Sequence, residues 1–245
     1  IAKYTGVTRA RNLERFRDIA ARKGVLEQNR DFARASGALA AALYREENEL
    51  FLRTPRMGGF QILDLQDYPG QGSALVGVLD AFMDSKGHIT PAQWRESCSP
   101  VVPLARFDRY TWTVDETYVA DLELAHYGEH DLKAATAEWT LSDVVGAVRA
   151  CGALPAQDLA QGGLREVGRI AVPLAKLPAP ARYTLAISVR SGAEAFTNHY
   201  PLWVYPAKVD TTVPAGVTLV RRYDAATAAL LAEGKRVVLV PDSKN

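Results

Sequence analysis

The spacing of the hydrophobic residues changes near Pro100, and this change constrains the fold more than any other feature of the chain. Between residues 7 and 53 apolar side chains recur at helical spacing, whereas after Pro100 they alternate with polar ones. A period near 3.6 buries one face of a helix, and a period of 2 buries one face of a strand. We therefore expect an α/β segment followed by an all-β domain.

Two helices are expected before residue 54. The first ends at Gly24, and the second ends at Thr54-Pro55, because the residue before a proline disfavours the helical conformation. The second helix has an apolar stripe and a charged face, and we expect the charged face to be solvated. The stripe consists of Phe32, Ala35, Leu39, Leu43 and Leu50, and the charged face of Arg45, Glu46, Glu47 and Glu49.

A short apolar segment bounded by glycine, residues 59–65, comes next and is typical of a buried parallel strand. Residues 68–72 have the chemistry of a turn, and residues 74–84 return to helical spacing. Thr90, Pro91 and Gln93 form a capping box at the start of a further helix. The order helix, helix, strand, loop, helix indicates an α/β architecture.

Five short runs after Pro100 alternate apolar with polar residues, at 118–124, 137–141, 170–174, 183–189 and 202–205. This pattern predicts a β-sandwich, immunoglobulin-like in type but without the Cys…Trp…Cys hallmark of antibody domains. The alternation places Trp139 and Trp203 in the core and leaves Trp112 less constrained. It also places Glu123 on the solvent side of its strand, and the same exposure is expected for Glu116.

The last residues read as strand, helix, strand. Residues 217–220 and 236–240 are the strands, Asp224 caps the helix and Gly234 ends it. We expect this unit to open a domain that further residues complete, because two strands leave a sheet with an unpaired edge.

Bulk properties exclude several classes of protein. The net charge of +1 gives no footprint for nucleic acid or a membrane surface, and no apolar run is long enough to span a bilayer. The two cysteines, Cys98 and Cys151, form no metal-binding pattern, so two free buried thiols are expected. The chain begins at Ile1 without a methionine or a signal peptide, so residue 1 is not expected to be the start of the gene product.

The most concentrated polar set is Asp64, Gln66, Asp67 and Gln71. It follows the apolar segment directly, and in a β/α barrel the active site lies at the carboxyl ends of the strands. Carboxylates and amides suit the paired donors and acceptors of a sugar. The alternative is that Asp64 and Asp67 cap the next helix or brace the loop, and composition alone does not decide between the two.

The run GGFQILDLQDYPGQGSALVGVLDAFMDSKG at 58–87 resembles the last barrel strand and active-site loop of family 2 glycoside hydrolases, the β-galactosidase and β-glucuronidase group. It looks most like a multidomain bacterial branch. The segments VADLELAHYG at 119–128, PLWVYP at 201–206 and GVTLVRRYDAATAALLAEGKRVVLVPD at 216–242 are similar to the same branch. One departure concerns the aromatic platform, since Leu63-Asp64 stands where the family has Trp-Asp; Tyr68 is a candidate replacement.

The resemblance implies a fold, an activity and a site. The fold would be the C-terminal part of a TIM-type barrel over 1–98, a sandwich over 99–206 and the start of an additional domain over 207–245. The activity would be retaining hydrolysis of β-linked glycosides with two glutamates, both expected upstream of Ile1, and with no metal or cofactor. The substrate-binding residues would be Asp64, Gln66, Asp67, Tyr68 and Gln71.

The implied partners are a glycoside or oligosaccharide and the remainder of the same polypeptide, without nucleic acid or membrane, in a periplasmic or secreted bacterial protein. A second reading has no catalytic role: a carbohydrate-binding or scaffold module in which the sandwich binds the sugar. The two differ in where aromatic rings lie, since a binding module exposes a row of them on one sheet face.

Overall fold

The computed structural model describes residues 1–7, 9–68 and 75–242. They form two compact units, Ile1–Tyr205 and Pro206–Asn245, which are described separately. None of the helices in these ranges is both long enough and apolar enough to cross a lipid bilayer.

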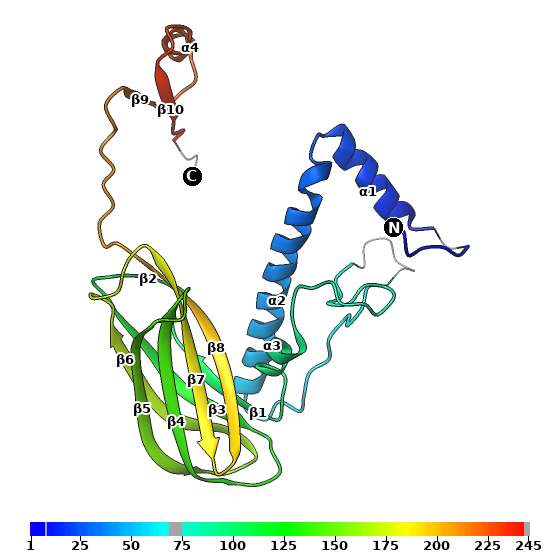
Figure 1. Ribbon diagram of the computed structural model, residues 1–245, viewed down its shortest axis with the longest axis vertical. Coiled ribbons are helices and arrows are strands. Elements are labelled where there is room, and N and C mark those ends of the chain that lie inside the picture. The colour runs from blue at the N-terminus through cyan, green and yellow to red at the C-terminus, as the bar shows by residue number, and fades with distance from the viewer. Residues whose placement is uncertain (8, 69–74, 243–245) are drawn as a thin grey trace. The chain divides into compact units, whose positions relative to one another are not determined.

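The first unit opens with helices (Figure 1). α1 spans Arg11–Arg22, a 3₁₀ turn η1 spans Leu26–Gln28, and α2 spans Asn29–Arg53. Gly24 follows α1 with a φ of 70°, a conformation that glycine adopts without strain. The two helices and their ends confirm the sequence prediction.

The short helix α3, Pro91–Arg95, has the predicted capping box. The Thr90 hydroxyl accepts a hydrogen bond from the Gln93 amide at 3.2 Å, and the Gln93 side chain accepts one from the Thr90 amide at 2.9 Å. Two amides at the start of the helix are thereby satisfied.

The expected barrel portion is wrong for the described residues. Residues 59–65 form no strand, and Leu63 and Leu65 are 83% and 52% exposed. Residues 75–84 form turns rather than a helix, joined by isolated bridges from Leu79 to Gln66 and to Ser85. A parallel strand exists only where neighbouring strands supply its hydrogen bonds, and no described strand lies beside this segment.

The β-sandwich consists of two sheets (Figure 1). One has the order β1-β3-β6 and the other β2-β8-β7-β4-β5, with antiparallel pairs except for β2 and β8. The strands are β1 Val101–Arg106, β2 Thr111–Thr113, β3 Thr117–His126, β4 Leu132–Asp143, β5 Val148–Leu159, β6 Gly163–Pro173, β7 Ala181–Ser191 and β8 Glu194–Tyr205. The five predicted runs fall on β3, β4, β6, β7 and β8, and the run 170–174 extends one residue beyond the end of β6.

One hydrophobic core fills the space between the sheets. It takes Tyr118 and Leu122 from β3 and Leu185 and Ile187 from β7, each at most 1% exposed. Trp139 packs against this core as predicted.

Trp112 and Trp203 have different surroundings. Trp112 is 7% exposed, and its indole nitrogen donates to the Arg109 carbonyl at 2.8 Å, so it belongs to the core. The core position predicted for Trp203 is wrong: its neighbours Leu202 and Val204 point inward, so Trp203 lies on the outer face of the sheet.

The two cysteines are free, as predicted, but neither is buried. Cys98 is half-buried, and Cys151 is exposed. Cys151 lies on β5, which pairs only with β4 and therefore forms an edge of its sheet.

The end of α2 covers the outer face of the smaller sheet. Val102, Leu104 and Ala125 are fully buried in a second cluster, against which Leu52 of α2 and Leu164 of β6 pack. This contact explains why β1 is buried on both faces.

The second unit confirms the predicted strand, helix and strand. β9 (Val217–Val220) pairs in parallel with β10 (Arg236–Leu239), and α4 spans Ala225–Ala232. The Asp224 carboxylate caps α4 by accepting a hydrogen bond from the Thr227 amide at 2.9 Å.

Candidate functional site

The predicted site residues lie on the loop between α2 and α3. Asp67 is 6% exposed, and its Oδ1 accepts hydrogen bonds from the Lys86 ammonium at 2.6 Å and the Gly77 amide at 3.1 Å. Its own amide donates to the Leu79 carbonyl at 3.1 Å. Asp67 therefore braces the loop, the role that the sequence left open as an alternative to sugar binding.

A glycine is needed at position 77, where the backbone comes close to residues 66 and 67. A Cβ added there would lie 2.3 Å from the Gln66 carbonyl carbon and 2.6 Å from the Asp67 amide nitrogen. Only a residue without a side chain allows the two backbone segments to approach so closely.

The other predicted residues are more accessible. Gln66 is exposed, Tyr68 is 56% exposed, and Asp64 is half-buried. Gln71 lies outside the described residues. Asp64, Gln66, Asp67 and Tyr68 thus lie on one loop, and of these four side chains Asp67 alone forms hydrogen bonds with another described residue.

A groove of about 410 Å³ runs between α2 and residues 75–88 of this loop. Tyr44 joins its two sides, since the phenol hydroxyl donates to the Val76 carbonyl at 3.0 Å. The groove is lined by Ser36, Gly37, Ala40, Leu43, Tyr44, Glu47, Leu75, Val76, Gly77, Lys86 and His88.

Charge around the groove acts on Tyr44. Burial raises the pKa of its phenol, and the carboxylates of Glu47, Asp64 and Asp67 raise it further. The loop therefore places two of its predicted site residues within electrostatic reach of α2.

His88 packs against α2 where the helix has no side chain. A Cβ on Gly37 would lie 2.2 Å from the imidazole Nδ1, so the ring occupies the space that the glycine leaves. The described residues hold no cluster of three or more histidine, cysteine, aspartate or glutamate side chains suited to a metal ion.

A second polar assembly joins α2 to the sandwich, and the sequence did not predict it. We call it the Glu49 junction: Arg45, Glu49 and Arg53 of α2 with Asn198 and Tyr200 of β8. Glu49 is 1% exposed, which corrects the prediction that it lies on a solvated helix face.

Each oxygen of the Glu49 carboxylate accepts two hydrogen bonds. Oε1 accepts from Arg45 Nε at 3.1 Å and from Asn198 Nδ2 at 3.2 Å. Oε2 accepts from Arg53 Nη2 at 3.1 Å and from the Tyr200 hydroxyl at 3.0 Å. The buried charge is therefore paired and fully bonded.

The junction also fixes the backbone of β1. Asn198 Nδ2 donates to the Pro103 carbonyl at 2.7 Å, the Tyr200 hydroxyl accepts from the Ala105 amide at 3.0 Å, and Arg53 donates to the Ala105 carbonyl at 2.9 Å.

Glu123 is another buried carboxylate beside the junction. It is 4% exposed, which corrects its predicted solvent position, and it pairs with Arg53 at 3.3 Å and with Arg106 at 2.8 Å. Glu46 and Glu47 are exposed as predicted, and Glu116 is half-buried.

A signal for the junction was present in the sequence. Arg45, Glu49 and Arg53 recur every four residues on α2, the spacing of helical ion pairs. Asn198 stands at an inward position of a strand, where a buried amide needs partners. Neither pattern predicts that these residues of α2 contact Asn198 of β8.

Comparisons with known proteins leave the family of the chain unassigned. Residues 116–206 match the model of a domain of unknown function, DUF8488. No curated protein matches the chain.

Solved structures that resemble the chain include two glycosidases. The exo-chitosanase CsxA of Amycolatopsis orientalis is 17% identical, over 74% of this chain and 20% of that one, with a TM-score of 0.45. The β-glucuronidase of Parabacteroides merdae is 15% identical, over 43% of this chain and 14% of that one, with a TM-score of 0.32. The chain thus spans a fifth or less of these enzymes.

The sporulation control protein Spo0M of Bacillus subtilis also resembles this chain, with a TM-score similar to that of the β-glucuronidase. The identity is 8% over 44% of this chain and 50% of that one, with a TM-score of 0.34. Likeness of this degree extends to proteins of different function and assigns no activity.

Proposed function

We propose that the chain is part of a retaining glycoside hydrolase acting on β-linked glycosides, β-galactosidase-like in type, in which it supplies a sugar-binding wall and not the catalytic glutamates. The observation that carries the proposal is the 58–87 run, with its resemblance to the active-site loop of family 2 enzymes. The sandwich would be the immunoglobulin-like domain that follows the barrel.

The loop geometry supports different roles within the wall. Asp67 holds the loop in shape through Lys86 and Gly77, so its effect on a sugar is indirect. Gln66 and Tyr68 are accessible for contact with sugar hydroxyls or a sugar face. Asp64 lies near Tyr44 and would accept from a hydroxyl beside them.

The groove contributes no pair of catalytic carboxylates. Retaining hydrolysis needs two carboxyl groups about 5–5.5 Å apart. Glu47 is the one carboxylate among the groove-lining residues. The proposal accordingly assigns the acid/base and the nucleophile to other residues of the enzyme.

Two measurements test the proposal. The chain by itself is expected to release no phenol from aryl β-galactosides or β-glucuronides, and robust turnover would contradict the assignment of the glutamates. In the longer polypeptide, Gln66→Ala and Tyr68→Ala should each lower kcat/KM by roughly tenfold or more, the size expected when a bond to the transition state is lost.

The matched control is Gln93→Ala, which removes an exposed amide whose described side-chain hydrogen bonds belong to the α3 cap. It should leave kcat/KM unchanged. Equal activity of the Gln66 and Tyr68 variants with the unmodified enzyme would remove the loop from the substrate site.

A further inference from the structure

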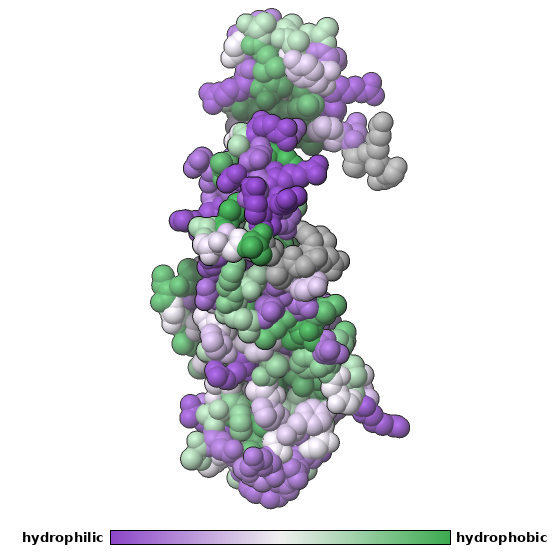
Figure 2. Space-filling view, turned by 90° about the vertical axis from the view of Figure 1, so that its right-hand side faces the viewer, coloured by the Kyte–Doolittle hydropathy of each residue, from purple (hydrophilic) through white to green (hydrophobic). Residues whose placement is uncertain are grey.

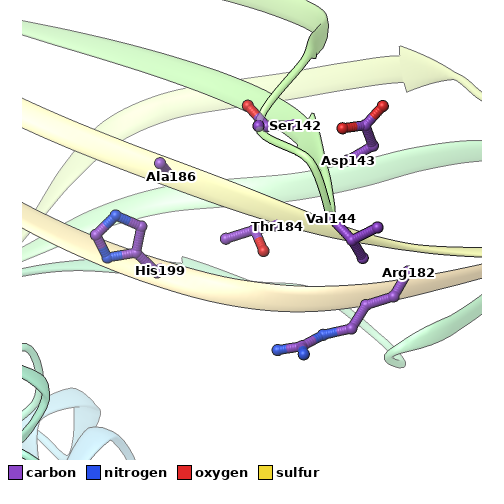
Figure 3. Close-up of a pocket in the computed structure, with 8 residues that line it drawn as sticks. Ser142, Asp143, Val144, Arg182, Thr184, Ala186 and His199 are labelled. Atoms are coloured by element: carbon purple, nitrogen blue, oxygen red, sulfur yellow. The ribbon is translucent and has the colours of Figure 1, made fainter.

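The outer face of the five-stranded sheet carries a hollow of about 430 Å³. Strands β4, β7 and β8 form its floor, and the turn after β4 forms one wall (Figure 3). The lining residues are Ser142, Asp143, Val144, Gly146, Arg182, Thr184, Ala186 and His199. None of them belongs to the core, and one of them, His199, touches the Glu49 junction, because its amide donates to Asn198 Oδ1 at 2.9 Å.

The strand register explains the hollow. Ala186 stands between Thr140 of β4 and His199 of β8, and its methyl group leaves the centre of the face unfilled. Ser142 and Thr184 are direct cross-strand neighbours one row further along. In Figure 3 Thr184 appears between His199 and Arg182.

The wall of the hollow is held in place before any ligand arrives. Asp143 Oδ1 accepts hydrogen bonds from the Val145 and Ala147 amides, both at 3.0 Å, and Oδ2 pairs with Arg149 at 2.6 Å. The carboxylate is thus used within the turn, and its charge is balanced by Arg149.

His199 is fixed as well. Its Nδ1 lies 2.8 Å from Glu96 Oε1, and Glu96 is also 3.6 Å from Arg45. The ring is therefore oriented from one side, and its Nε2 forms no hydrogen bond with another described residue.

Three groups around the hollow form no hydrogen bond or ion pair with their side chains within the described part of the chain. The Arg182 guanidinium forms no ion pair there and lies 5.8 Å from the centre of the Trp203 ring. The hydroxyls of Ser142 and Thr184 form no hydrogen bond with another described residue. A cation and two hydroxyls thus surround a space that protein atoms do not fill.

We propose that this hollow binds a sugar unit that bears a carboxylate, a uronic acid. Arg182 would take the carboxylate, because the guanidinium fork matches two carboxylate oxygens. Ser142, Thr184 and His199 Nε2 would meet the ring hydroxyls, and a hollow of this volume lies within the usual range for small-molecule sites. The site does not depend on the proposed glycosidase role.

The experiment is a calorimetric titration of the full chain with three probes: methyl β-glucuronide, the neutral methyl β-glucoside, and sulfate as an anion without a ring. The glucuronide should bind at least about tenfold more tightly than either control, since a charge-assisted bond contributes that much. Arg182→Ala should weaken glucuronide binding by about the same factor. Ala186→Leu, which fills the hollow, should abolish it.

Arg190→Ala is the matched control, because Arg190 is exposed on the same face of the same strand and lines no part of the hollow. It should bind as the unmodified chain does. Circular dichroism checks that each variant folds. If Arg182→Ala or Ala186→Leu does not fold, Thr184→Val, close in shape, should still weaken binding.

Three results would each overturn the proposal. One is equal affinity for glucuronide and glucoside, which would show a neutral site. Another is sulfate binding as tightly as glucuronide, which would show an anion site. The third is no glucuronide binding up to roughly 50 mM, or binding unaffected by the folded Arg182, Ala186 or Thr184 variants.

Discussion

Apolar side chains are buried to different extents in two regions of the first unit. One region is the sandwich, and the other is the segment that contains α2 and the loop after it. The sandwich encloses its inward residues in one core, where Leu185 and Ile187 are at most 1% exposed. On α2, Leu39 and Leu43 remain 61% and 55% exposed. Figure 2, which looks at the right-hand side of Figure 1, shows hydrophobic patches among polar surface. Apolar periodicity identifies both regions, but among the described residues it leads to an enclosed core in the sandwich and to a largely exposed stripe on α2.

What joins the two regions is mainly polar. In the described part of the chain, the last turns of α2 meet the sandwich. The contacts are Leu52, the Glu49 junction, the Arg53–Glu123 ion pair and the Tyr110–Glu46 hydrogen bond. The position of α2, and with it one side of the groove, should therefore depend strongly on the Glu49 carboxylate. This comparison leads to four predictions, in order of expected effect.

Replacing Glu49 by alanine should have the largest effect. It removes the buried carboxylate that Arg45 and Arg53 share and leaves the Asn198 amide and the Tyr200 hydroxyl without this acceptor. Breaking a buried pair costs about 3–5 kcal/mol. Chemical unfolding of the full chain measures the loss in the free energy of unfolding. Glu47→Ala, on the same helix but exposed, should cost less than about 0.5 kcal/mol, and equal losses would contradict the junction.

Paired leucine truncations compare the two regions directly. Leu185→Ala in the core should cost about 2–5 kcal/mol, because it removes buried methyl groups and leaves a cavity. Leu39→Ala on α2 should cost less than about 0.5 kcal/mol, since that side chain is largely in water already. A large cost at Leu39 in the same unfolding experiment would mean that the stripe is covered.

Loosening the loop brace should have a smaller effect. Asp67→Ala removes the acceptor of Lys86 and of the Gly77 amide, and leaving such donors unpaired costs about 1–3 kcal/mol. Limited proteolysis should then cut within residues 75–88 sooner than in the unmodified chain. Asp84→Ala, which removes only an exposed pair with Lys3, is the control and should not change the rate.

Alkaline titration should distinguish the two regions, because their tyrosines differ in how far the pKa is raised. Burial raises the pKa of Tyr118 and Tyr200 in the sandwich far above the ordinary value of 10.0 and raises that of Tyr44 less strongly. The folded state therefore holds these protons more tightly than the unfolded state. The stability they contribute is present below the unfolded pKa and is lost as pH rises above it.

Tyrosinate absorbance follows this titration. Tyr44 should ionise in the folded protein, and its signal should disappear in Tyr44→Phe. Tyr118 and Tyr200 should ionise only as the sandwich unfolds. Ionisation of either one while circular dichroism still reports a folded sandwich would contradict the burial described for them.

The sequence predicted the elements whose formation is determined by a local residue pattern. Helix ends at Gly24 and Thr90 follow from local caps, and β3 and β7 follow from alternation with one face buried. β1 was missed because α2 covers its outer face, so that it does not alternate. β5 was missed because its edge position leaves most of it exposed or half-buried.

The candidate site was predictable only in part. The sequence singled out residues 64–68 as a sugar-binding loop, which stays a prediction. Whether Asp67 faces a ligand or its own loop depends on Lys86, 19 residues away. The predicted strand 59–65 failed because apolar composition gives a strand no hydrogen-bond partners. Glu49 and Glu123 were predicted to be in solvent. A periodicity shows which residues share a face of a helix or strand, but it does not show whether another element packs on that face.

The most direct test of this comparison is hydrogen exchange along the full chain and its Glu49→Ala variant. In the unmodified chain the amides of residues 45–53 should be protected together with those of β7. In Glu49→Ala residues 45–53 should lose protection while β7 keeps it. If both segments lose protection together, or if residues 45–53 are unaffected, the claim that Glu49 holds α2 to an independently stable sandwich is wrong.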